Sequence, residues 1–182
     1  MSLVPKKVFF VKGIGHHTSK LGAFEQALRN AGIEKYNLVN VSSVLPPHCV
    51  EIKKKEGFKQ LRPGQIVYTV LSRVDSNKLD QMISASIGVA KPSDKDQYGY
   101  LSEHHMYDAK PEGIGEYTEE LAAEMLATSL GIDFNPEADY DEKREVFKMG
   151  GKIVETKHIT EYATSKKENE WTSVVVAAVF IL

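Results

Sequence analysis

Apolar residues alternate with polar ones, or gather in short runs, over most of this chain, and both patterns are typical of β-strands. Aromatic and β-branched residues fill these runs, and turn-forming residues bound them. The pattern predicts strands at 6–13, 37–45, 64–75, 79–92, 97–108, 151–165 and 170–182, with a short strand extension at 49–52. The segment GIGHHTS after the first strand is rich in backbone freedom and predicts a loop.

Two segments show helical spacing of their apolar residues instead. The first begins after Ser19, a residue suited to the N-cap, and ends at Gly32, where a C-cap glycine belongs. The second lies at 116–130 and is closed by Gly131. Runs of strands outnumber the crossovers between them, so the order of elements predicts an α+β fold with mostly antiparallel sheets. We expect the polar segment 133–151 to be an excursion between packed elements.

Length and composition narrow the class of protein. A chain of 182 residues is long enough for a sizeable core and short for two, so we expect one domain over residues 1–182. A net charge of -2 and a pI near 6.3 lack the basic footprint of a nucleic-acid-binding protein. The longest apolar run, at 174–182, is about half of the ~20 residues that a membrane-spanning helix needs. No secretory cleavage signal follows the N-terminal apolar residues, so we expect a cytoplasmic protein that binds no membrane.

Cysteine and histidine positions bear on metal binding. Cys49 is the single cysteine, which excludes an intrachain disulfide and a multi-cysteine metal cluster. The pairs His16–His17 and His104–His105 suggest metal ligands, but adjacent residues on a strand face opposite sides of the sheet and cannot chelate one ion together. We therefore expect no metal site.

The most distinctive segment is NLVNVSSVLPP, at 37–47, in which two serines end a hydrophobic strand and two prolines follow. No GxSxG elbow surrounds the serines, so a hydrolase triad is not indicated. The hydroxyl of Ser43 instead lies beside the carbonyl of Ser42, its own preceding peptide bond. If the fold strains that bond by about 1–3 kcal/mol, an N-to-O acyl shift becomes feasible. The prolines favour this chemistry because they hold the residues between them and the serines extended.

The ester produced by such a shift could lose its acyl group by β-elimination and then hydrolyse. The chain would be cut into residues 1–42 and 43–182, and a pyruvoyl group would remain where Ser43 stood. A simpler interpretation is that Ser42 and Ser43 bond the local backbone, as serines often do before proline-rich turns.

The sequence resembles the pyruvoyl-dependent arginine decarboxylases over nearly its whole length. The resemblance rests on AFEQALRNAGI (23–33), NLVNVSSVLPP (37–47), ISASIGVAKP (83–92), GYLSEHH (99–105) and the apolar terminal strand, in the family's order. It implies an αββα four-layer sandwich, a self-cleaved precursor, a homotrimer of two-chain units with sites between subunits, and conversion of L-arginine to agmatine and carbon dioxide. The cofactor would be a pyruvoyl group made from Ser43, which withdraws electrons as the substrate's carboxylate leaves.

The resemblance also assigns roles to three further residues. Glu103 would give a proton to the substrate's α-carbon, and Asn37 would assist self-cleavage by hydrogen-bonding the oxyanion of the acyl shift. Glu25 would receive the guanidinium of arginine, although the family pattern has an aspartate there, which reaches one methylene less far. Six residues of straight strand separate Asn37 from Ser43 by about 20 Å at ~3.3 Å per residue, so these two could share a site only across a subunit boundary or a bend.

Each of these residues has a simpler interpretation as well. Glu25 could form a surface pair with Arg29, four residues on. Glu103 could be a solvated strand residue, and Asn37 could cap the entrance of its strand. Two alternative functions also stay open: a decarboxylase of another basic amino acid, since Glu25 alone does not measure substrate length, and a non-catalytic oligomeric binding protein on the same scaffold.

Overall fold

The computed structural model describes residues 3–132 and 153–182, so the predicted excursion at 133–151 lies outside the described residues. In chain order the elements are β1 (Lys7–His17), α1 (Lys20–Ala31), β2 (Asn37–Asn40), β3 (Val44–Leu45), β4 (Val50–Glu51), α2 (Lys54–Phe58), β5 (Ile66–Ser76), β6 (Met82–Pro92), β7 (Gly99–Tyr107), α3 (Pro111–Ser129), β8 (Ile153–Thr164) and β9 (Trp171–Ile181). The predicted α+β class is confirmed. No helix among the described residues is long and apolar enough to cross a membrane.

The strands form two sheets. The first has the order β2-β5-β9-β1-β4 and is mixed, because β4 runs parallel to β1 and β2 runs parallel to β5. The second has the order β3-β7-β6-β8 and is antiparallel throughout. Most strand pairs are therefore antiparallel, as the order of elements predicts.

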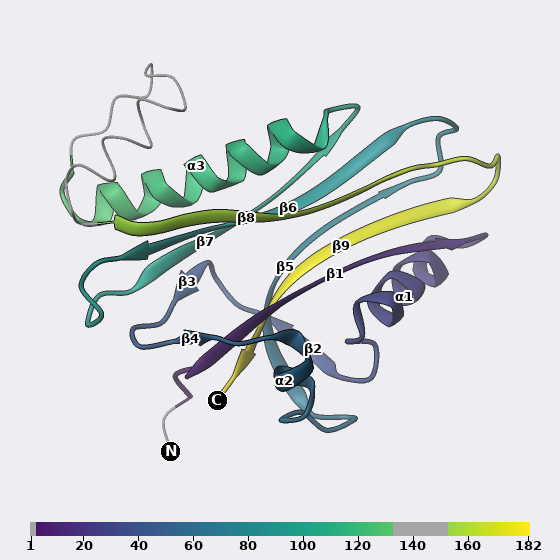
Figure 1. Ribbon diagram of the computed structural model, residues 1–182. Helices are drawn as coiled ribbons and strands as arrows, with labels where there is room; N and C mark the ends of the chain where they lie inside the picture. The colour runs from purple at the N-terminus through teal and green to yellow at the C-terminus, as the bar shows by residue number, and fades with distance from the viewer. Residues whose placement is uncertain (1–2, 133–152) are drawn as a thin grey trace.

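Three clusters of buried side chains hold these elements together. The central cluster takes residues from both sheets, such as Val174 of β9 and Ile87 of β6. The next residue of β9, Val175, faces the opposite way and packs with Ala27 of α1 in a second cluster. A third cluster, which includes Leu126, joins α3 to the second sheet. Figure 1 shows α3 lying against β6 and β8, and α1 against β1 and β9. Each fully buried valine, leucine, isoleucine or phenylalanine side chain contributes about 1.5–3 kcal/mol to folding.

The first strand is longer than the sequence pattern predicts, and two glycines explain why. β1 runs through the segment predicted to be a loop and pairs with β9 over its whole length. A Cβ atom on Gly13 would lie 2.2 Å from the carbonyl oxygen of Ala27, and one on Gly15 would lie 2.1 Å from that of Ala23. The glycines therefore let α1 approach the strand closely and do not break it.

The helix predictions are confirmed, with one addition. The side chain of Ser19 accepts a hydrogen bond from the backbone of Gly22, and Gly32 adopts a left-handed φ of 84° at the end of α1. α3 begins five residues earlier than the apolar spacing predicts, with Pro111 in its first turn. The short helix α2 is not predicted from the sequence.

The predicted strand at 37–45 is divided between the two sheets. β2 belongs to the five-stranded sheet, whereas β3 belongs to the four-stranded sheet. The chain passes from one sheet to the other at Val41, Ser42 and Ser43, which belong to neither strand. The serine pair thus lies at a crossover and not at the end of one continuous strand.

Candidate active site

Three hydrogen bonds fix the backbone and side chain around the serine pair. The hydroxyl of Ser43 donates to Glu103 Oε2 at 2.7 Å. The backbone N–H of Leu101 donates to the carbonyl oxygen of Ser43, and that of Val44 donates to the carbonyl oxygen of Ser42, both at 2.8 Å. The last bond closes a three-residue γ-turn centred on Ser43. The hydroxyl therefore has a carboxylate acceptor, and the neighbouring carbonyl has an N–H donor.

Glu103 reaches this position because of the alternation along β7. Leu101, two residues before it, is fully buried in the central cluster, and Glu103 lies on the same face of the strand but is exposed to solvent. Ser102 faces the other way, and its hydroxyl donates to the backbone carbonyl of Thr118 in α3. Because β3 pairs with only the start of β7, the rest of β7 is left open beside the serine pair.

Glu103 also lines a cavity of about 460 Å³. We call it the Glu103 cavity. The other residues that line it are Phe24, Asn40, Leu71, Ser72, Arg73, His104 and His105. Both sheets and helix α1 therefore contribute residues to the lining of this cavity.

The structure does not bring Asn37 or Glu25 into this constellation within the described chain. Asn37 Nδ2 donates to the backbone oxygen of Gly64 at 2.7 Å, next to the pairing of β2 with β5. Glu25 is exposed on α1 and accepts a hydrogen bond from Arg29, which raises the pKa of the Arg29 guanidinium. The surface pair considered from the sequence is thus formed.

Comparison with known proteins gives the site its context. The family model described as pyruvoyl-dependent arginine decarboxylase (PvlArgDC) matches residues 7–182. The probable pyruvoyl-dependent arginine decarboxylase of Chlorobaculum tepidum is 54% identical over 181 residues, which cover 100% of this chain and 99% of that protein. Pyruvoyl-dependent arginine decarboxylase 2 of Methanosarcina acetivorans is 48% identical over 179 residues, and the coverage is 98% of both chains. The pyruvoyl-dependent arginine decarboxylase of Methanococcoides burtonii is 48% identical over 180 residues.

The chain belongs to the pyruvoyl-dependent arginine decarboxylase family. The predicted resemblance, enzyme class and pyruvoyl cofactor are therefore confirmed at the level of the family. The residues around Ser43 fit such a group: the Ser43 hydroxyl is hydrogen-bonded to a carboxylate that can act as a base, and the carbonyl of Ser42 accepts a backbone N–H.

Arg73 lines the Glu103 cavity, and no sequence motif points to it. Its Nε donates to both carboxylate oxygens of Asp75, at 3.1 and 3.0 Å, and its Cζ lies 3.6 Å from the centre of the Phe24 ring. A single arginine within a strand does not by itself indicate a site. The alternation along β5, which puts Arg73 on the same face as Leu71, is the one sequence signal that points to it.

His104 is a second missed residue of this cavity. Its ring lies 5.0 Å from that of Tyr117 and 6.1 Å from that of His105. Burial and, to a lesser degree, the charge of His105 lower the pKa of His104 below its usual value. This shift favours the neutral form of the His104 ring.

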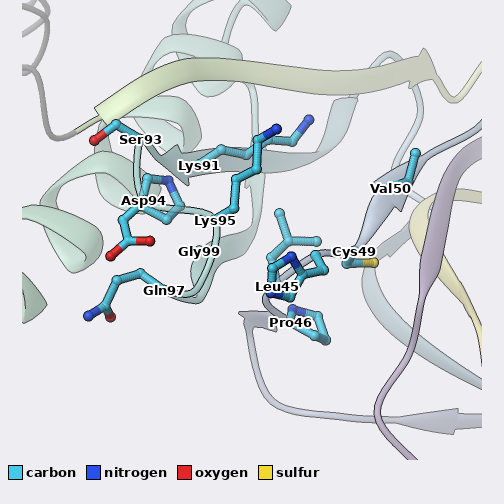
Figure 2. Close-up of a pocket in the computed structure, with 12 residues that line it drawn as sticks. Leu45, Pro46, Cys49, Val50, Lys91, Ser93, Asp94, Lys95, Gln97 and Gly99 are labelled. Atoms are coloured by element: carbon cyan, nitrogen blue, oxygen red, sulfur yellow. The ribbon is translucent and has the colours of Figure 1, made fainter.

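Two further cavities border the strand that follows Ser43. One, of about 460 Å³, lies between β3 and the turn from β6 to β7; Figure 2 shows Leu45, Pro46 and Cys49 on one side of it and Lys95 on the other. Burial raises the pKa of the Cys49 thiol to about 11, so this thiol is not an activated nucleophile. A smaller, mostly apolar cavity touches Ser42 itself. Neither cavity includes Glu103.

No group of three or more histidine, cysteine, aspartate or glutamate side chains is placed to hold a metal ion within residues 3–132 and 153–182.

Proposed function

We propose that this chain is a single domain that cleaves itself between Ser42 and Ser43 and then decarboxylates L-arginine to agmatine. The observation that carries the proposal is the 2.7 Å hydrogen bond from the Ser43 hydroxyl to Glu103. It pairs a weak nucleophile with a base, which is the arrangement that activates a serine. The products of cleavage are residues 1–42 and residues 43–182 with a pyruvoyl group at position 43.

Cleavage begins with attack of Ser43 Oγ on the carbonyl carbon of Ser42. Glu103 Oε2 takes the hydroxyl proton, the new C–O bond forms, and the C–N bond breaks as the amine of Ser43 receives a proton. Negative charge develops on the Ser42 oxygen during this step. The N–H of Val44, 2.8 Å from that oxygen, stabilises the charge.

The remaining steps are an elimination and a hydrolysis. Loss of the α-proton of Ser43 breaks its Cβ–Oγ bond and releases the carboxylate of Ser42 as the new C-terminus. The dehydroalanine left at position 43 becomes an imine, and one water molecule converts it to the ketone and releases ammonia. The Leu101 N–H keeps the carbonyl of residue 43 in place beside Glu103 through these changes.

The pyruvoyl group, once formed, supplies a carbonyl that takes up the substrate's amine and accepts the electron pair released with carbon dioxide. Glu103 lies where a carboxylic acid can return a proton to the α-carbon, because its carboxylate touches the side chain of residue 43. Glu25 binds the guanidinium of the substrate. Glu25 is exposed on α1, and its carboxylate already pairs with the guanidinium of Arg29. This pairing supports a role for Glu25 in binding the guanidinium of a substrate.

We also propose a homotrimer in which neighbouring subunits complete the site. In the described part of the chain, Asn37 hydrogen-bonds Gly64 and Glu25 pairs with Arg29, and neither side chain bonds Ser43 or Glu103. We therefore assign their roles in the site to a neighbouring subunit. Exposed apolar side chains accompany them: Val39 and Val44 are each 40% exposed, and Ile66 is 60% exposed. Such groups suit burial against a partner subunit. Asn37 of a neighbour then adds a second donor to the oxyanion.

The four-layer αββα order belongs to the same proposal. It is supported by the three core clusters, which place α1 and α3 on different sheets. A cytoplasmic location is part of the same proposal.

The alternative substrate is a basic amino acid other than L-arginine. Glu25, in place of the aspartate of the family pattern, reaches one methylene further and could accept a shorter substrate. Carbon dioxide release from L-arginine, L-lysine and L-ornithine under identical conditions tests this. Release from arginine with at least tenfold higher kcat/KM supports the proposal, and a preference for ornithine or lysine contradicts it. A chain that stays uncleaved and releases no carbon dioxide from any of the three would be a non-catalytic binding protein.

A further inference from the structure

The Glu103 cavity contains a cation whose orientation is fixed. The Nε of Arg73 is held by both oxygens of Asp75, and its guanidinium plane lies over the Phe24 ring. The Asp75 side chain is only 9% exposed, so this anchor is itself held within the protein. Both hydrogen bonds that the Arg73 side chain donates within the described part of the chain come from Nε, so its two terminal nitrogens are left without an acceptor there, and the residue lines the cavity.

A fixed guanidinium with free terminal nitrogens is suited to one kind of ligand. Two parallel N–H groups match the two oxygens of a carboxylate, and the positive charge repels a second guanidinium or an amine. Because Arg73 is already oriented by Asp75 and Phe24, binding a carboxylate costs little further side-chain entropy. The cavity therefore favours an anionic group close to Glu103.

We propose that Arg73 binds the α-carboxylate of the substrate and thereby sets the direction in which the substrate lies. This inference rests on the proposed function, in which the α-carbon of an amino acid lies beside Glu103. The guanidinium of L-arginine then points out of the cavity, away from Arg73 and toward a carboxylate such as Glu25 on another surface. A reversed substrate would place two guanidinium groups together in a half-buried space.

The contact with Arg73 is stronger for the substrate than for the product. The α-carboxylate carries a full charge in bound arginine, and agmatine has no carboxylate at all. An interaction that exists in the ground state and fades as carbon dioxide leaves lowers KM and does little for kcat. Arg73 consequently favours substrate binding and leaves agmatine free to dissociate.

The test compares Arg73→Gln and Arg73→Lys with the unmodified enzyme after cleavage has been verified by intact mass. Steady-state carbon dioxide release gives KM and kcat for L-arginine, and calorimetric titration gives the Kd of agmatine. We expect KM to rise roughly 10- to 100-fold in Arg73→Gln, as loss of a charged hydrogen bond requires, while kcat changes less than about threefold. The Kd of agmatine should stay within about twofold, and Arg73→Lys should recover part of the loss in KM because it keeps the charge.

Lys20 offers a matched control. Its ammonium also pairs with Asp75, at 3.7 Å, but Lys20 does not line the cavity. Lys20→Gln should leave the KM for arginine unchanged. An unchanged KM in Arg73→Gln would overturn the proposal. A Kd of agmatine that rises in parallel with KM would also overturn it, because it would indicate that the substitution damages the whole pocket. Failure of the proposed function would look different, because the unmodified chain would then release no carbon dioxide from arginine.

Discussion

Ser43 and Glu103 lie 60 residues apart in the sequence, yet the hydroxyl of one donates to the carboxylate of the other at 2.7 Å. The pairing of β3 with β7 produces this contact, since Leu45 is paired with Gly99 and Val44 with Tyr100. One carboxylate is thereby in reach of both proposed reactions. It can take the proton from Ser43 before cleavage and can give a proton to the substrate afterwards.

Glu103→Gln tests the role of this carboxylate as a base. Glutamine can still hydrogen-bond Ser43 but cannot take up its proton, so self-cleavage should slow by about 10²- to 10⁴-fold. The time course of full-length chain and fragments, followed by intact mass from freshly purified protein, measures the effect. Glu112→Gln, on the exposed first turn of α3, is the control and should cleave normally. Cleavage of Glu103→Gln at the unmodified rate would remove Glu103 from this step.

Val44→Pro tests the backbone donor of the acyl shift. Proline lacks the N–H that bonds the Ser42 oxygen at 2.8 Å, so cleavage should slow by about 10²- to 10³-fold, the usual effect of losing one oxyanion donor. Hydroxylamine cleaves esters, and it should not restore cleavage in this variant because the block precedes the ester.

Val44→Ala is the partner variant, because it shortens the side chain and keeps the N–H. It should cleave within a few-fold of the unmodified chain. Equal slowing of Val44→Ala and Val44→Pro would mean that the side chain, not the N–H, matters. Rapid release of fragments from Val44→Pro by hydroxylamine would place the block after the acyl shift.

Glu25 and Arg29 can be separated by substitution. Glu25→Gln removes the carboxylate proposed to bind the guanidinium of arginine, so KM should rise roughly 10- to 100-fold. Arg29→Ala removes the guanidinium that pairs with Glu25 and would compete with the substrate, so KM should stay the same or fall. Carbon dioxide release at several arginine concentrations measures both. A KM that is insensitive to Glu25→Gln would show that the helix α1 pair is only a surface contact.

The sequence predicts most elements of the fold, and the exceptions have physical reasons. Alternation locates the long strands because buried and exposed positions differ strongly there. The sequence pattern predicts a loop at the end of β1, since glycine normally signals a turn, and the pairing of this segment with β9 becomes visible only in three dimensions. The division of 37–45 between two sheets was also missed, because local sequence gives no sign of which sheet a strand joins.

The same limit applies to the site. The resemblance to the family points to Ser43 and Glu103, and their hydrogen bond agrees with the roles that it implies. The separation of about 20 Å between Asn37 and Ser43 assumed a straight strand. The structure has a crossover in that interval, so the estimate is an upper bound. Arg73 and His104 depend on contacts between distant segments, which no motif reveals.

Gly88→Ala tests the close packing that holds α3 on the second sheet. A Cβ at this position would lie 1.9 Å from the carbonyl oxygen of Thr118, a backbone atom that cannot rotate away. We expect a loss of about 1–3 kcal/mol in stability and a lower Tm at fixed protein concentration. Gly113 lies in α3 and has open space around it, so Gly113→Ala should leave Tm unchanged or raise it. An equal Tm for both variants would contradict the close approach.

Intact-mass analysis of the purified chain and of Ser43→Ala tests the central claim most directly. The unmodified chain should give residues 1–42 and a fragment 43–182 that is lighter, by one ammonia, than a fragment beginning with serine. Ser43→Ala should give one full-length species and release no carbon dioxide from arginine. A full-length unmodified chain that is active, or a fragment that begins with intact serine, would contradict the account.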